Sequence, residues 1–120
     1  MKRYKVTATV AADGTGTFYT PRLSGELCAI EYVKVDYADG VDFTITDEAT
    51  TKTLWTESNV NAAKVCAPRL PRHSTAGVAE LYASGGTAVT DRIPLANTRV
   101  KIAIAQGGVS KTATFHVLVD

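Results

Sequence analysis

The stretch that decides the fold class is Val100-Lys101-Ile102-Ala103-Ile104-Ala105-Gln106-Gly107-Gly108, together with the segment 112–119 that follows it. In both segments large apolar residues alternate with polar or small ones, and this period of two is typical of a half-buried β-strand. Gln106-Gly107-Gly108 has the composition of a turn. We therefore predict a terminal β-hairpin with one face in the core, formed by Val100, Ile102 and Ile104 and by Ala113, Phe115, Val117 and Val119.

The same alternation recurs upstream. It is clearest at residues 3–11 and 41–46, and weaker extended stretches follow at 16–23, 53–56 and 78–83. Asp13-Gly14 is a common hairpin turn, so we expect the first two stretches to be linked by it. The segment 27–37 is also predicted to be a strand, but its apolar residues change face along the way, which a bulge near Tyr32 or burial on both faces would explain.

The regular pattern lapses between Asn59 and Gly77, where Pro68, Pro71 and Gly77 interrupt it, and we predict a long surface loop there. Seven to nine short strands with turns between them, supported by 17 Thr and 13 Val, give the fold class. We predict an all-β, single-domain antiparallel β-sandwich or small barrel over residues 1–120, of the immunoglobulin-like or jelly-roll-like kind.

Composition excludes several classes of protein. The formal net charge is +1, which argues against a protein that coats nucleic acid by releasing counterions. No apolar run approaches the roughly 18 residues that a membrane-spanning helix needs. Thr7, Thr9 and Asp13 interrupt what would be the apolar part of a signal peptide, so we expect no targeting segment.

No cysteine or histidine has neighbours that suggest a catalytic or metal site. Cys28 and Cys66 are 38 positions apart and lack the spacing of a zinc knuckle or a CxxC motif. His73 and His116 have no nucleophile signature beside them. We predict no enzyme activity and no cofactor. Cys28 is expected to be a small core residue, although the sequence leaves a disulfide with Cys66 open.

The acidic stretch, residues 36–48, contains no Lys or Arg. It contains five carboxylates: Asp36, Asp39, Asp42, Asp47 and Glu48. It lacks the order of an EF-hand loop, and aspartates are common in turns because their side chains accept hydrogen bonds from nearby backbone N–H groups. The glycine pairs Gly85-Gly86 and Gly107-Gly108 are not followed by the residues of a phosphate-binding loop. We therefore predict turns at all three places and no metal site.

The segment 64–73 is the candidate interaction element. Its two prolines restrict the free chain, which lowers the entropy lost when a partner holds it, and arginine can bind carboxylates with two hydrogen bonds. Since the acidic stretch lies elsewhere, the basic segment of one copy can meet the acidic turn of another and close into a ring. The predicted interface residues are Lys64, Pro68, Arg69, Leu70, Arg72 and His73, with Asp39 and Asp42 on the acidic side.

Several motifs together resemble small proteins of tailed bacteriophages that are found among the genes for virion assembly. The motifs are Cys28-Ala29-Ile30-Glu31-Tyr32-Val33-Lys34, Gly40-Val41-Asp42-Phe43-Thr44-Ile45-Thr46, Pro68-Arg69 before a histidine, Ile93-Pro94-Leu95-Ala96 and Val100 to Gly108. The resemblance covers about residues 24–119. Most matching positions are strand alternation and turns.

The resemblance implies a structural protein of the phage head, namely a capsid decoration or minor capsid protein that binds the major capsid protein, and proteins of this kind often form trimers. It also implies assembly in a reducing bacterial cytoplasm, where both cysteines stay free thiols. We expect no nucleic-acid or membrane partner. The alternatives are a neck or tail component, or a carbohydrate-binding module that stacks sugars on Trp55, although we expect Trp55 to lie in the core.

Overall fold

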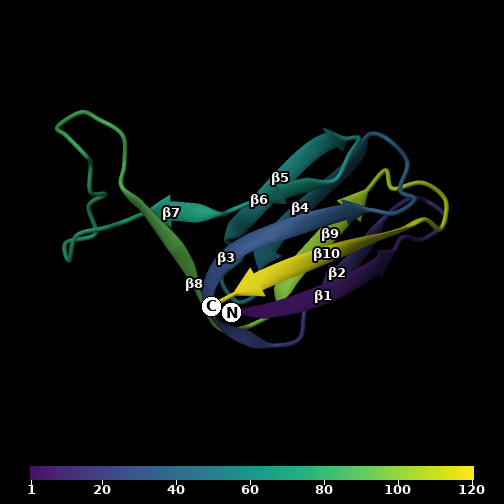
Figure 1. Cartoon of the computed structure of the whole chain (residues 1–120), viewed down its shortest axis with the longest axis horizontal. Helices are drawn as coiled ribbons and strands as arrows, with labels where there is room; N and C mark the ends of the chain where they lie inside the picture. The colour runs from purple at the N-terminus through teal and green to yellow at the C-terminus, as the bar shows by residue number, and fades with distance from the viewer.

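The computed structural model describes residues 1–120, and all its regular elements are β-strands (Figure 1). Alternation of apolar and polar residues determines where they form, because successive side chains of a strand point to opposite faces. The strands are β1 (Lys2–Thr9), β2 (Gly16–Tyr19), β3 (Leu23–Lys34), β4 (Val41–Asp47), β5 (Thr53–Val60), β6 (Lys64–Cys66), β7 (Arg69–Pro71), β8 (Thr90–Thr98), β9 (Val100–Ala105) and β10 (Thr112–Val119).

The strands form two antiparallel sheets that pack face to face. The larger sheet has the order β1-β10-β3-β8-β7, and β6 also pairs with β3. The smaller sheet has the order β2-β9-β4-β5. The predicted all-β sandwich is therefore confirmed.

An aromatic cluster occupies the middle of the core. The Phe43 ring lies 5.3 Å from Tyr32, 5.4 Å from Phe115 and 4.9 Å from Trp55, measured between ring centroids. Aromatic rings at such distances, tilted or edge-on, gain about 0.5–1.5 kcal/mol beyond their burial. Aliphatic residues from both sheets surround them, including Val6, Ile30, Val41, Ile45, Leu95, Val100, Ile102, Ile104 and Val117.

The last two strands do not form the predicted terminal hairpin. Both exist, but β9 pairs with β2 and β4, whereas β10 pairs with β1 and β3 in the opposite sheet. The segment between them crosses from one sheet to the other. The predicted hairpin at Asp13-Gly14 is wrong for the same reason, because β1 and β2 also lie in different sheets.

These two crossing segments hydrogen-bond to each other, which explains their glycines. Gly107 N donates to Gly14 O over 2.9 Å, and Val10 N donates to Lys111 O over 2.9 Å. Gly14 has a φ of +81°, and a Cβ there would lie 3.2 Å from Gly107 N. Glycine is needed at this position because the two backbones approach so closely.

Other boundaries also differ from the sequence predictions. The bulge in β3 lies at Cys28, where the register with β10 shifts, and not near Tyr32. Residues 78–83 form no strand and make only isolated bridges. The predicted loop from Asn59 to Gly77 contains the end of β5 and the short strands β6 and β7.

The hairpin formed by β7 and β8 continues outward beyond the sandwich (Figure 1). We call residues Arg72–Val89 the arm. The radius of gyration is 15.7 Å, compared with about 13.6 Å expected for a compact domain of this length. The arm accounts for the elongated shape, whose extents are 49 × 30 × 22 Å.

Candidate interaction surface

The predicted basic segment is the base of the arm. Lys64 lies in β6 and pairs with Tyr32 of β3, whereas Arg69 lies in β7 and pairs with Arg92 of β8. Pro68 is buried between the two short strands, and Leu70 packs against the core. The segment is therefore fixed to the sandwich by backbone pairing and is not a solvated loop.

The positive charges of this segment have partners within the chain. Lys64 Nζ lies 2.9 Å from Glu57 Oε1, and Arg72 Nε lies 3.2 Å from Glu80 Oε2. Arg69 Nη1 donates to the carbonyl oxygens of Cys28 and Pro68, at 3.1 and 2.8 Å. His73 makes an isolated backbone bridge with Ala79 in the arm.

The predicted acidic partners are also engaged internally. Asp39 forms an ion pair with Lys34. Asp42 Oδ1 accepts a hydrogen bond from Asn59 N at 2.9 Å, and its Oδ2 accepts one from Gln106 at 3.2 Å. Asp42 accepts a hydrogen bond from Gln106 of the crossing segment, and Ala38, next to Asp39, donates its N–H to Gly107 O there. The arm projects from the opposite end of the sandwich (Figure 1), so the structure does not bring the two predicted halves of the interface together within one copy.

The other carboxylates of the acidic stretch cap turns or bind one arginine. Asp36 accepts from Thr112 N, and Asp47 accepts from Ala49 N. Glu48 accepts two hydrogen bonds from Arg99, at 2.9 and 2.5 Å, and this contact lowers the pKa of Glu48 below its usual range. No group of three or more acidic, histidine or cysteine side chains is arranged to hold a metal ion.

The arm branches at a three-way backbone junction. Arg72 N donates to Val89 O, Glu80 N to Arg72 O, and Val89 N to Glu80 O, at 2.7, 2.7 and 2.9 Å. The Arg72–Glu80 ion pair lies at this junction. Beyond it the chain forms two small lobes, residues 74–78 and 82–87, each closed by one backbone hydrogen bond across its base.

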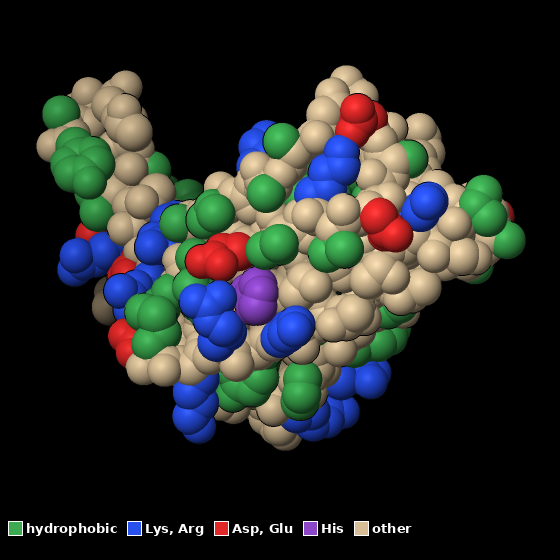
Figure 2. Space-filling model, turned by 45° about the vertical axis from the view of Figure 1, so that its right-hand side comes forward, with side chains coloured by type: hydrophobic (Ala, Val, Ile, Leu, Met, Phe, Trp, Pro, Cys, Tyr) green, Lys and Arg blue, Asp and Glu red, His purple; other side chains and the backbone are tan.

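The arm displays apolar side chains to solvent. Val78 is 65% exposed, Leu81 44% and Tyr82 75%, and no residue of the arm is buried (Figure 2, green side chains at the upper left). Between residues 74 and 89 the only charged side chain is Glu80, which is already paired with Arg72. Beyond the Arg72–Glu80 pair at its base, the arm is thus an uncharged, partly apolar projection.

The exposed residues Val78, Leu81 and Tyr82 were not predicted from the sequence as an interaction element. The sequence feature that marks the arm is a run of 16 residues, from Ser74 to Val89, that contains only one charged residue. Gly77 and Gly85-Gly86 interrupt this run. Its apolar residues follow neither a period of two nor 3.6, so periodicity could not distinguish an exposed projection from a loop.

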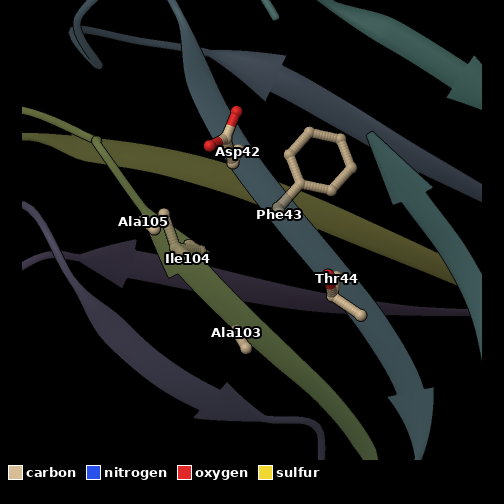
Figure 3. Close-up of a pocket in the computed structure, with 6 residues that line it drawn as sticks. All are labelled: Asp42, Phe43, Thr44, Ala103, Ile104 and Ala105. Atoms are coloured by element: carbon tan, nitrogen blue, oxygen red, sulfur yellow. The ribbon is translucent and has the colours of Figure 1, made fainter. Parts of the chain in front are cut away.

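A shallow hollow of about 180 Å³ lies on the outer face of the smaller sheet between β4 and β9 (Figure 3). The small outward side chains Ala103 and Ala105 leave this space, and Asp42 is the only charged residue that lines it. Its volume is below the roughly 300–1,000 Å³ typical of small-molecule sites. Both oxygens of Asp42 are already used in hydrogen bonds.

The environments of the cysteines, His116 and Trp55 indicate structural roles. Cys28 and Cys66 are free, and burial raises the pKa of the Cys66 thiol, which lowers its reactivity. His116 lies in a cross-strand row between Lys5 and Glu31, and its Nδ1 is buried without a hydrogen-bond partner. Trp55 is 7% exposed and stacks edge-on against Phe43, as expected for a core residue, so it offers no free face to a sugar.

Comparison with known proteins gives no assignment. No protein-family model matches the chain, and no curated protein is significantly similar to it in sequence. The chain contains no helix with the length and hydrophobicity that crossing a membrane requires.

Proposed function

We propose that the chain is a non-enzymatic structural protein of a tailed-phage virion, which docks through its surfaces on the capsid lattice as a decoration or minor capsid protein. The resemblance of the sequence motifs to virion proteins suggests the class. The single structural observation that supports docking is the arm, which holds Val78, Leu81 and Tyr82 in solvent on an ordered scaffold.

Such an arm gains little from folding unless a partner covers it. Fixing each residue of the arm costs about 1–2 kcal/mol of backbone entropy, and burial of apolar surface is the main compensation. No arm residue is buried within the chain. Interface cores are depleted in charged residues and enriched in aromatic ones, and the arm has this composition around Tyr82.

In this proposal the basic segment positions the arm and does not itself hold the partner. Arg69 fixes the base of the arm to the backbone of β3, and Arg72 holds the junction through Glu80. Leu70 and Pro68 anchor the same segment to the sandwich. A rigid base lowers the entropy lost when the arm meets a protein surface such as the major capsid protein.

The test is to locate the chain in particles. Virions of the phage that encodes the chain are purified, the chain is measured by quantitative mass spectrometry, and immunogold electron microscopy locates it. Many copies with label over the head support the proposal. Label at the neck or tail supports the alternative assignment instead, and absence of the chain from the particles overturns both.

A binding assay adds a control for specificity. Heads assembled without the chain are sedimented with purified wild-type protein, and saturable co-sedimentation is expected. Val109→Ser serves as the matched control, because Val109 is 67% exposed but lies in the crossing segment and not in the arm. The arm variant Leu81→Ser with Tyr82→Ser, at exposed positions, should bind about tenfold or more weakly than wild type and Val109→Ser. An arm variant that binds as tightly as these two proteins would contradict the role given to the arm.

A further inference from the structure

The strands at the edges of the two sheets differ in how well they are protected from further pairing. In the smaller sheet, β2 has only four residues, and the register between β5 and β4 shifts twice. In the larger sheet, β6 and β7 have three residues each, and β7 contains Pro71. Short strands, bulges and prolines are common means of stopping a sheet edge from pairing with another chain. β1 has none of these features.

β1 is a regular strand of eight residues with one free edge. Each residue from Lys2 to Thr9 pairs with β10 without a register shift, and no strand of the larger sheet lies on the other side. In Figure 1 it is the purple strand that begins beside the N-terminus. β1 is therefore the one long, regular edge of the molecule.

Alternate residues of β1 direct their backbone groups to this free edge. At the end of the ladder Val10 N donates to Lys111 O over 2.9 Å, and hydrogen-bonded and non-hydrogen-bonded pairs alternate along antiparallel strands. The even-numbered residues of β1 therefore bond to β10. The residues whose N–H and C=O groups point away from β10 are Arg3, Lys5, Thr7 and Thr9. We call them the edge residues.

A side-chain contact supports this assignment. The hydroxyls of Thr9 and Thr112 hydrogen-bond over 2.9 Å, and side chains lie closer together in non-hydrogen-bonded pairs. No turn or loop of the chain forms a backbone hydrogen bond with an edge residue. All four edge residues are exposed, so their backbone groups are open to a further strand.

The charges of β1 indicate which kind of strand fits it. Lys2, Arg3 and Lys5 occupy its first half. Arg3 Nη1 lies 3.3 Å from Glu31, whereas Lys2 and Lys5 take part in none of the ion pairs within the chain. Lysines on an edge strand disfavour pairing with apolar or basic strands, but opposite charges on neighbouring strands stabilise a sheet. The edge of β1 therefore selects carboxylates.

The other face of β1 selects apolar side chains. Val6 belongs to the hydrophobic core, and Tyr4 packs against it. A strand added beside β1 places every second side chain at this border of the core, because successive side chains point to opposite faces. A segment in which carboxylates alternate with apolar residues thus matches both faces of β1.

We propose that β1 binds an extended acidic segment of a partner protein by adding it to the larger sheet as a further strand. In strand addition, main-chain hydrogen bonds provide affinity and alternate side chains provide specificity. Here the edge residues form the hydrogen bonds, and Lys2 and Lys5 recognise the carboxylates. The proposal goes beyond the capsid contact proposed above and does not depend on it, because that contact uses the arm.

The first test uses a synthetic peptide of the same length as β1, capped at both ends, in which Glu alternates with Val. Isothermal titration calorimetry should detect binding to the wild-type chain at peptide concentrations up to about 1 mM. The control peptide has Lys in place of every Glu. It should bind about tenfold or more weakly, because like charges on neighbouring strands are destabilising.

Two variants at one position separate backbone pairing from charge attraction. Thr7→Pro removes the N–H at the middle of the free edge but keeps the ladder with β10, since proline is tolerated in an edge strand where the N–H faces solvent. It should weaken binding of the acidic peptide about tenfold or more. Thr7→Ala is the matched control, because it keeps the N–H, and it should bind as wild type does. Circular dichroism melts establish that both variants fold.

Amide hydrogen exchange followed by NMR gives a second readout, on the wild-type chain itself. In the free chain the amides of the edge residues should exchange fast, whereas the even-numbered amides of β1 should exchange slowly. Saturating acidic peptide should slow the edge amides. Where Thr7→Pro does not fold, this measurement decides the point.

Four results overturn the proposal: no binding of the acidic peptide to wild type, equal binding of the Lys peptide, a folded Thr7→Pro that binds as wild type, or edge amides that saturating peptide does not slow. Each of them leaves the assignment to the virion intact. A chain that occurs on phage heads but does not bind the acidic peptide contradicts only this proposal. A chain that binds the peptide through β1 but is absent from virions contradicts only the proposed function.

Discussion

The sandwich and the arm of this chain are ordered by different interactions. In the sandwich, 23 buried residues form one continuous hydrophobic cluster between the sheets. In the arm no residue is buried, and order comes from backbone hydrogen bonds and the Arg72–Glu80 ion pair. The sandwich therefore has its own hydrophobic core, whereas the arm has none.

The largest expected effect tests this contrast directly. Phe115→Ala removes a fully buried ring at the centre of the core and should lower the free energy of unfolding by about 3–5 kcal/mol. Tyr82→Ser removes a ring of similar size from the arm and should change it by less than about 0.5 kcal/mol. Urea unfolding followed by circular dichroism measures both. A comparable loss in the two variants would show that the arm is part of the cooperative core.

The next largest loss of stability is expected at a buried polar contact in the sandwich. Thr98 Oγ1 donates to Asp47 Oδ1 over 2.6 Å, and both residues are buried. Thr98→Val keeps the volume and removes the donor, so it should cost about 1.5–3 kcal/mol, the range for hydrogen bonds to charged groups. Thr44→Val is the control, because Thr44 is exposed and bonds only Thr56. Equal effects at the two sites would contradict this role for Thr98.

Removing the hydroxyl from each of two core tyrosines should change the free energy of unfolding by smaller amounts that differ in sign. Tyr37 donates its hydroxyl to the carbonyl of Ala8 over 2.7 Å, whereas the buried hydroxyl of Tyr32 has no partner. Tyr37→Phe should destabilise the fold by about 1 kcal/mol. Tyr32→Phe should leave stability unchanged or raise it, because an unsatisfied hydroxyl is removed from the core. The two variants differ only in which hydroxyl is lost, so denaturation of both under one condition decides the point.

The sequence predicted the positions of the strands better than it predicted which strands pair with each other. Alternation at 100–105 and 112–119 correctly indicated two half-buried strands. It did not show that β9 and β10 lie in opposite sheets, because a period of two defines which face is buried and not which strand lies alongside. In a sandwich both arrangements bury the same side chains, so the pattern of Ile102 and Phe115 fits either.

Strands at the edge of the sheet were missed for a different reason. β8 contains Pro94, which removes a backbone donor and argues against a central strand. β7 covers β8 only at residues 90–92, so the backbone at Pro94 has no strand on that side. The partners of the basic residues could not be predicted either. Residue type identified Arg69 and Arg72 as candidates, but their partners, the carbonyl of Cys28 and the carboxylate of Glu80, are set by the tertiary fold.

The smallest effect compares one ion pair in each region. Arg99 binds Glu48 with two hydrogen bonds and stacks over Tyr19, 4.2 Å from the ring centroid, whereas Arg72 meets Glu80 through a single contact of 3.2 Å. Glu48→Gln should lower global stability slightly at neutral pH. Glu80→Gln should leave global stability unchanged and speed amide exchange at the arm junction, because the arm is not part of the core.

The pH dependence of Glu48→Gln distinguishes the ion pair from a packing change. Arg99 lowers the pKa of Glu48 in the folded protein below the reference value of 4.5, so the unfolded chain binds a proton there first as the pH falls. The contribution is fully present above pH 4.5 and is lost as the pH falls through the lowered pKa. The difference in unfolding free energy between wild type and Glu48→Gln should therefore shrink below pH 4.5, and added salt should also reduce it. A difference that stays constant from pH 7 to the acid limit would show that the amide perturbs packing and that the charge of Glu48 contributes nothing.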